Sequence, residues 1–191
     1  MKIGILVNFV AFQIGWFACV LGGAHDWPWL GTLTAVVVIG LHLYQAQRPQ
    51  TEVLLIVLTG IIGLILDSVP VFLGWLVYPS GVLIEGLAPH WIVAMWMMFA
   101  TTLNVTFTWL KGKFWLAAVL GVVAGPMAYY GGAKLGGLEF IDLTAALIAL
   151  GINWGIAMPL LIMLSDRYDG MAETSRGSDV HDVSAITKRS E

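Results

Sequence analysis

Charge and cysteine are both scarce in this chain. Charged residues make up 11% of its 191 residues, whereas soluble domains carry about 25%. The single cysteine, Cys19, excludes an internal disulfide and any metal or redox site built from several cysteines. We therefore expect a chain whose solvent is mainly lipid, with neither a bound metal nor another cofactor.

Motifs of soluble enzymes and nucleic-acid-binding proteins are also missing. The net charge is −3, and no Gly-Lys-Ser or Gly-Lys-Thr loop for phosphates occurs. Neither Gly-x-Ser-x-Gly nor His-Glu-x-x-His occurs. His25, Asp26, Glu85 and His90 form at most a weak metal site, because such loop residues are more often simply solvated. These absences argue against nucleic acid as a partner and disfavour an enzyme.

Long apolar runs dominate what is present. Hydrophobic residues account for 59% of the chain, and the mean hydropathy is +0.86. Six segments reach, or nearly reach, the length needed to cross a hydrocarbon core of about 30 Å as helices. Short loops join them, which is typical of a compact antiparallel bundle. The predicted spans are 3–22, 30–46, 53–77, 91–110, 114–133 and 141–164.

Basic residues predict the orientation of this all-α, polytopic protein with six transmembrane helices. Lysine and arginine are enriched in cytoplasmic loops. With a cytoplasmic N-terminus, only Lys134 among the basic residues falls outside. Both termini are therefore predicted to be cytoplasmic. Residues 1–165 should form the transmembrane domain, and the polar residues 166–191 should form a disordered cytoplasmic tail.

Asp67 is the acidic residue that lies deepest within the apolar runs. A carboxylate inside a membrane is costly unless it is paired, protonated or hydrated, so such a residue is a candidate functional site. It follows Gly63 at helical spacing and precedes Pro70, which leaves the Leu66 carbonyl without its helical donor. Two interpretations stay open: a site for charge or a proton, and a structural ion pair with Lys134.

Other polar side chains recur within the predicted spans. Met97, Thr101, Asn104 and Thr108 form a stripe at helical spacing on the fourth span. Such groups either bond neighbouring helices or line a polar cavity, and glycine stripes on the first, fifth and sixth spans favour close packing. No catalytic residue can be assigned. The predicted binding residues are Asp67, Asn104, Gln13, Asn8, Tyr129 and Lys134.

An ordered set of motifs resembles a known family. The motifs lie at residues 8–19, 66–68, 91–96, 99–104 and 125–136 (NFVAFQIGWFAC, LDS, WIVAMW, FATTLN and GPMAYYGGAKLG). They are similar to a family of small, six-helix bacterial inner-membrane proteins described as a domain of unknown function. The resemblance runs through nearly all of residues 4–164. It implies a bacterial inner-membrane location and favours a role close to membrane lipids, but it implies no particular activity.

Our leading hypothesis is that the chain binds or moves a small or amphipathic molecule, such as a lipid derivative, through a polar bundle interior. Asp67 would carry the charge or proton, and Asn104, Gln13 and Asn8 would supply hydrogen bonds. Two other classes stay open: a membrane-embedded enzyme of lipid metabolism, and an accessory or structural subunit of a membrane complex. Membrane lipids are the expected partners, and assembly into a homo-oligomer or a hetero-oligomer stays open.

Overall fold

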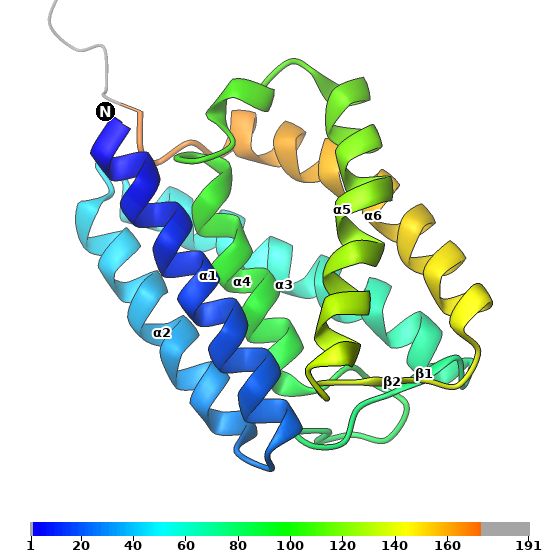
Figure 1. The fold of residues 1–191 in the computed structure, drawn as a ribbon. Coiled ribbons are helices and arrows are strands. Elements are labelled where there is room, and N and C mark those ends of the chain that lie inside the picture. The colour runs from blue at the N-terminus through cyan, green and yellow to red at the C-terminus, as the bar shows by residue number, and fades with distance from the viewer. Residues whose placement is uncertain (1, 173–191) are drawn as a thin grey trace, which may run out of the picture.

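The computed structural model describes residues 2–172 (Figure 1). Within these residues, helices account for most of the chain, and the sheet is a single pair of two-residue strands. The all-α prediction is therefore confirmed. The elements are α1 (Lys2–Ala24), α2 (Pro28–Gln45), α3 (Pro49–Phe72), β1 (Leu76–Val77), α4 (His90–Leu103), the 3-10 helix η1 (Thr108–Leu110), α5 (Phe114–Lys134), β2 (Glu139–Phe140) and α6 (Leu143–Arg167).

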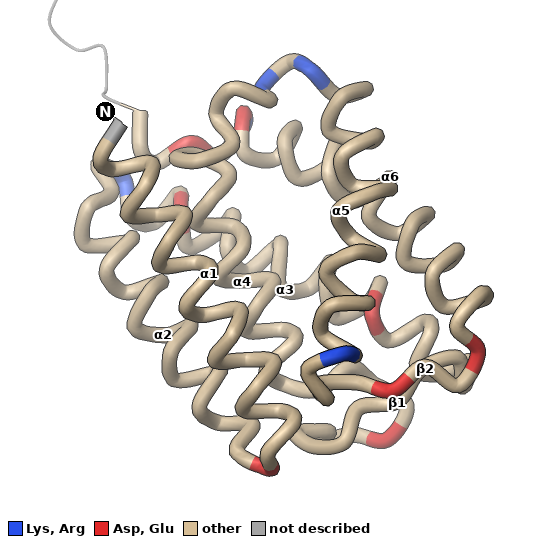
Figure 2. Tube along the Cα trace, in the orientation of Figure 1, with Lys and Arg blue, Asp and Glu red and all other residues tan. Residues whose placement is uncertain are grey.

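Four helices, α1, α3, α5 and α6, are long and apolar enough to cross a membrane. The other two are shorter, with 18 residues in α2 and 14 in α4. Large apolar side chains such as Ile14, Val123 and Ile152 are exposed on the outer faces of the long helices. Charged residues gather mainly toward the ends of the helices (Figure 2). The outer surface is therefore suited to lipid along the middle of the bundle.

The helices form two groups (Figure 1). In the first group, α1, α2 and α3 surround α4, so ten of the fourteen α4 residues are buried. In the second group, α5 and α6 form an antiparallel hairpin, and α6 packs against α3. The strand pair joins the groups at one end, where Leu76 faces Phe140 and Val77 faces Glu139.

The third helix ends earlier than the predicted span 53–77. Pro70 lies inside its last turns, and α3 stops at Phe72. Gly74 follows with φ of +70°, a left-handed conformation that glycine adopts readily at helix ends. Leu76–Val77 then form β1 instead of a further helical turn. Hydrophobicity could not mark this end, because the residues after the helix are as apolar as those within it.

The fourth helix is also shorter than predicted. The polar stripe predicted along it is therefore wrong for the residues after Leu103. α4 stops at Leu103, and Asn104 is its C-cap. The backbone amides of Thr106 and Phe107 both donate to the Thr102 carbonyl, so the chain forms a turn before η1 begins at Thr108. Asn104 and Thr108 therefore do not continue the helical face of the preceding turns.

The predicted boundary of the C-terminal tail falls too early. α6 continues to Arg167, and the next residues pack against the helix ends. The Arg48 backbone amide donates to the Gly170 carbonyl (2.9 Å), and Lys111 Nζ lies 2.7 Å from an Asp169 carboxylate oxygen. The folded domain therefore includes residues 166–172, and the rest of the predicted tail, residues 173–191, lies outside the described residues.

Asp169 is held in its ionised form by these contacts. Burial alone would raise the pKa of its carboxyl group. Hydrogen bonding and charge from Lys111, together with the backbone amides of Ala172 and Met171, outweigh burial and hold the pKa below its usual value of 3.8. The segment after α6 is therefore tied down by charge-assisted bonds at neutral pH.

Candidate functional site

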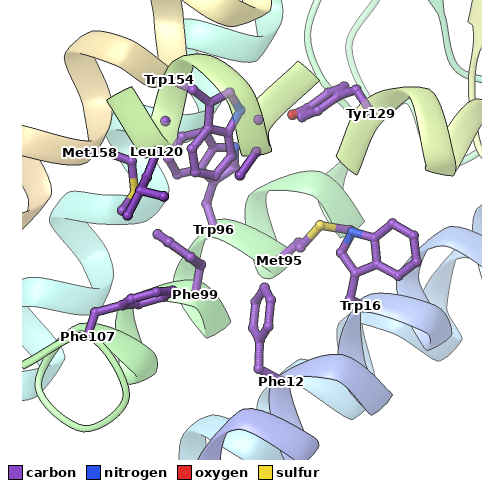
Figure 3. Close-up of a pocket in the computed structure, with 13 residues that line it drawn as sticks. Phe12, Trp16, Met95, Trp96, Phe99, Phe107, Leu120, Tyr129, Trp154 and Met158 are labelled. Carbon is purple, nitrogen blue, oxygen red and sulfur yellow. The ribbon is translucent and has the colours of Figure 1, made fainter. Parts of the chain in front are cut away.

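A cavity of about 210 Å³ lies between the two helix groups, and we call it the aromatic cavity. Rings from α1, α4, α5 and α6 point into it (Figure 3). Its lining is aromatic and apolar, so the polar interior predicted from the sequence is wrong for this cavity. The lining residues are Phe12, Trp16, Met95, Trp96, Phe99, Phe107, Leu120, Gly121, Ala124, Gly125, Tyr129, Trp154 and Met158.

Two stacked tryptophans form one wall of the aromatic cavity. The ring centroids of Trp96 and Trp154 are 4.3 Å apart, with 17° between their planes. A Cβ atom at Gly63 would lie 2.0 Å from Trp96 Cγ, and one at Gly125 would lie 2.3 Å from Trp154 Cγ. The stack therefore exists only because both positions lack a side chain, and the predicted packing role of the glycine stripe is confirmed at Gly125.

Asp67 lies behind this wall and is fully buried. Its Oδ2 accepts a hydrogen bond from Trp96 Nε1 at 2.6 Å and another from the Tyr129 hydroxyl. Both donors line the aromatic cavity, whereas Asp67 does not. Among residues 2–172, no hydrogen-bond donor reaches its Oδ1. Asp67 therefore fixes two rings of the wall without facing the cavity itself.

The ion pair between Asp67 and Lys134 that the sequence left open is not formed. Lys134 Nζ lies 5.2 Å from the centroid of the Tyr130 ring, a cation–π arrangement. Asp67 takes its hydrogen bonds from Trp96 and Tyr129 instead. Lys134 is therefore not part of the wall of the aromatic cavity.

The backbone break before Pro70 is repaired by a neighbouring helix. Pro70 has no amide hydrogen, so the Leu66 carbonyl lacks its helical donor. The Asn153 side-chain amide on α6 donates to this carbonyl at 2.8 Å. The bond couples α6 to α3 one residue from Asp67, so the break serves helix packing.

A second hollow adjoins the aromatic cavity between α1 and α5 and has a volume of about 430 Å³. We call it the side opening. The side opening is lined by Phe12, Gln13, Trp16, Leu120, Val123, Ala124, Met127 and Ala128.

Asn104 belongs to a different buried cluster, centred on Glu52. The fully buried Glu52 accepts hydrogen bonds from Asn104 Nδ2 (2.8 Å) and the Gly170 amide (2.7 Å). His42 Nε2 lies 2.7 Å from its other oxygen. Sequence reasoning missed Glu52, because a glutamate in the first turn of a helix usually faces water. The nearest signal was His42, an imidazole inside the preceding span.

The predicted binding residues thus separate into five places. Asp67 and Tyr129 meet at the wall of the aromatic cavity, and Gln13 lies in the side opening. Asn8 donates to the Thr101 carbonyl at 3.1 Å, and its Oδ1 accepts from the Thr106 hydroxyl at 2.6 Å, which pins the turn after α4 to α1. Asn104 and Lys134 lie elsewhere, as described above. Trp96 and Trp154 are the site residues that sequence reasoning missed.

A family model described as "Protein of unknown function (DUF2878)" matches residues 5–160. The chain belongs to this family. The matched region contains every residue that lines the aromatic cavity and the side opening. No curated protein and no solved structure matches the chain.

The loop residues considered as a metal site are not assembled into one in this DUF2878 protein. His90 Nδ1 lies 2.8 Å from the Thr32 hydroxyl, and its ring stacks on Trp29 at 4.3 Å. No group of three or more His, Cys, Asp or Glu residues within residues 2–172 is placed to hold a metal ion. The aromatic cavity is therefore the best-formed candidate site in the described part of the chain.

Proposed function

We propose that this DUF2878 protein is an integral protein of the bacterial inner membrane that binds an apolar or amphipathic, lipid-derived molecule. The observation that carries the proposal is the aromatic cavity of about 210 Å³ and its continuity with the side opening. For scale, a dry apolar cavity of about 150 Å³ in another protein holds benzene. A ring or a short run of methylene groups would therefore fit within this one.

The exposed surface supports placement in a bilayer. α1, α3, α5 and α6 have the length and composition of spans. At about 1.5 Å per residue, α4 is only about 21 Å long, but its three neighbours shield it from lipid. α2 exposes Leu33, Val36 and Val37 along its outer face. A bundle of six helices, each spanning or nearly spanning the bilayer, is therefore the arrangement we propose.

The side opening supports the bilayer as the source of the ligand. Val123 and Met127 line it and are also exposed on the outer face of α5, by 54% and 67%. In a membrane these side chains would contact acyl chains, and an apolar molecule could pass between them without meeting water. Burial of apolar surface next to aromatic rings would then hold it in the cavity.

A quenching experiment tests the proposal. Brominated octadecane, a hydrocarbon probe, is added to the purified full-length protein in a mild detergent at fixed concentration. Because Trp16, Trp96 and Trp154 line the cavity, bound probe should quench tryptophan emission with saturation. Quenching that rises only in proportion to the probe in the micelle would contradict the proposal.

Two variants on α5 test whether the saturable quenching comes from probe bound in the cavity. Ala124 lines both hollows, so Ala124→Phe should fill their junction and remove the saturable part of the quenching. Val119 is exposed on the same helix and lines neither hollow, so Val119→Phe should leave the saturable part unchanged. Equal loss in both variants would mean that the probe binds elsewhere.

A further inference from the structure

Gln13 is the polar residue of the side opening. It lies near the middle of α1 (Lys2–Ala24), beside Phe12 and one turn before Trp16, which both also line the aromatic cavity. Its side chain is half-buried. Within residues 2–172, no hydrogen bond engages its side-chain amide, which therefore lines the side opening with its bonding capacity unused.

The three asparagines of the chain behave differently. Asn8 bonds to Thr101 and Thr106, Asn104 bonds to Glu52, and Asn153 bonds to the Leu66 carbonyl. An amide left unpaired in hydrocarbon costs a few kcal/mol or more on transfer scales, so helices in membranes normally pair such groups with one another. An unpaired Gln13 is best explained by a partner that comes from outside the chain.

The chemistry of the two hollows limits what that partner can be. Neither lining contains a lysine, arginine, aspartate or glutamate. A charged head group would therefore lose its hydration without gaining a counter-ion. A glutamine amide offers two donors and an acceptor, so it can both give and receive a hydrogen bond from one hydroxyl group. The match is an uncharged head group.

We propose that the ligand is a single-chain amphiphile with an uncharged hydrogen-bonding head, of which a long-chain alcohol is the simplest form. The head bonds to Gln13 in the side opening, and part of the apolar chain occupies the aromatic cavity. The inference rests on the proposed function and adds the class of ligand to it. Gln13 contacts the ligand, whereas Asp67 acts only by fixing the wall.

Three brominated probes with the same chain length test the inference: octadecane, octadecanol and octadecyl phosphate. Octadecanol should bind about threefold to tenfold more tightly than octadecane, the range of one hydrogen bond between groups inside a membrane. Gln13→Leu should remove this difference and leave the affinity for octadecane unchanged. Gln13→Met, which keeps an unbranched side chain, should also remove the difference between the two probes. It is a second test in case Gln13→Leu fails to fold.

A matched control is available on α2. Gln45 is exposed and lies outside both hollows, and its amide bonds to the Leu41 carbonyl. Gln45→Leu should therefore keep the preference for octadecanol. If octadecane binds with saturation but octadecanol gains nothing, or if Gln13→Leu leaves the gain intact, the inference is overturned and the proposed function stands.

The charged probe supplies a second outcome. Octadecyl phosphate should bind more weakly than octadecanol, because no basic side chain lines either hollow. Phosphate binding as tight as alcohol binding would also overturn the inference. Failure of all three probes to quench with saturation would instead contradict the proposed function itself.

Discussion

Trp96 has contacts that fix its ring in three ways. Stacking on Trp154 sets the plane of the indole, and the hydrogen bond to Asp67 sets its rotation. The missing side chain at Gly63 sets how closely the ring approaches α3. A ring held in this manner presents a fixed surface to the aromatic cavity, so the cavity is formed before any ligand arrives.

Asp67 is expected to matter through these rings. Asp67→Ala leaves the Trp96 N–H and the Tyr129 hydroxyl buried without an acceptor, and each unpaired group costs about 1–3 kcal/mol. We expect a marked fall in thermal stability in detergent and a weaker affinity for brominated octadecane. Asp67→Asn keeps one acceptor oxygen and should lose less of both. Unchanged stability and binding in Asp67→Ala would show that the wall does not depend on this carboxylate.

The sequence could locate Asp67 but not its partners. An acidic residue in an apolar run is visible from composition alone, and Tyr129 was singled out with it. Trp96 carries no such signal, because an indole N–H has no charge and tryptophan is common near membrane interfaces in general. The aromatic cavity could not be predicted either, because its lining comes from four helices and the turn after α4, and their relative positions depend on packing.

At the scale of elements, the segment after α6 is clamped by α3. The Gly170 amide donates to Glu52, and a Cβ at Gly170 would lie 2.7 Å from Glu52 Cγ. Asn104 Nδ2 bonds to Glu52 and also to the Tyr168 carbonyl. The ends of α2, α3, α4 and α6 therefore converge on one carboxylate.

Replacement of Glu52 tests the clamp. In Glu52→Gln, an amide NH₂ would take the place of the oxygen that faces His42 Nε2, so the hydrogen bond between these two side chains would be disturbed. The charge-assisted bonds from Asn104 and Gly170 would also weaken, at a cost of about 2–3 kcal/mol. We expect faster tryptic cleavage after Arg167 and a lower unfolding temperature. Glu85→Gln, at an exposed position in the loop before α4, is the control and should change neither. Equal cleavage rates for Glu52→Gln and the native protein would contradict the clamp.

Helix ends were the least predictable elements. The ends of the spans are predicted from hydropathy, which depends on composition and does not show where the helical hydrogen bonds stop. The apolar residues after Phe72 form a turn and a strand, and those after Leu103 form a turn that is tied to α1 by Asn8. The number and order of the helices could be predicted, because the loops between them carry clear turn residues.

At the scale of the molecule, Arg48, Lys111, Lys113 and Arg167 lie where α3 begins, where α5 begins and where α6 ends, whereas Lys134 lies at the other end of α5. The predicted orientation can be tested by labelling cysteines that are introduced into the loops. Cys19, the only native cysteine, is buried and should contribute little labelling of its own. Glu85→Cys in the loop before α4 should react with a membrane-impermeant maleimide on intact cells. Gln47→Cys, in the loop between α2 and α3, should react only after the cells are permeabilised.

The native chain serves as the control for background labelling through Cys19. The reverse pattern, with Gln47→Cys labelled on intact cells and Glu85→Cys protected, would invert the orientation without changing the helix packing. Labelling of both positions on intact cells would mean that α3, the helix between them, does not cross the membrane.

The side opening also determines how an affinity for this site has to be expressed. A ligand that arrives between α1 and α5 is dissolved in lipid or detergent, not in the buffer. Its effective concentration is its mole fraction in that apolar phase, so adding detergent would empty the site, whereas adding buffer would leave occupancy nearly unchanged. Affinities measured in micelles and in vesicles should therefore agree as mole fractions and disagree as molar constants.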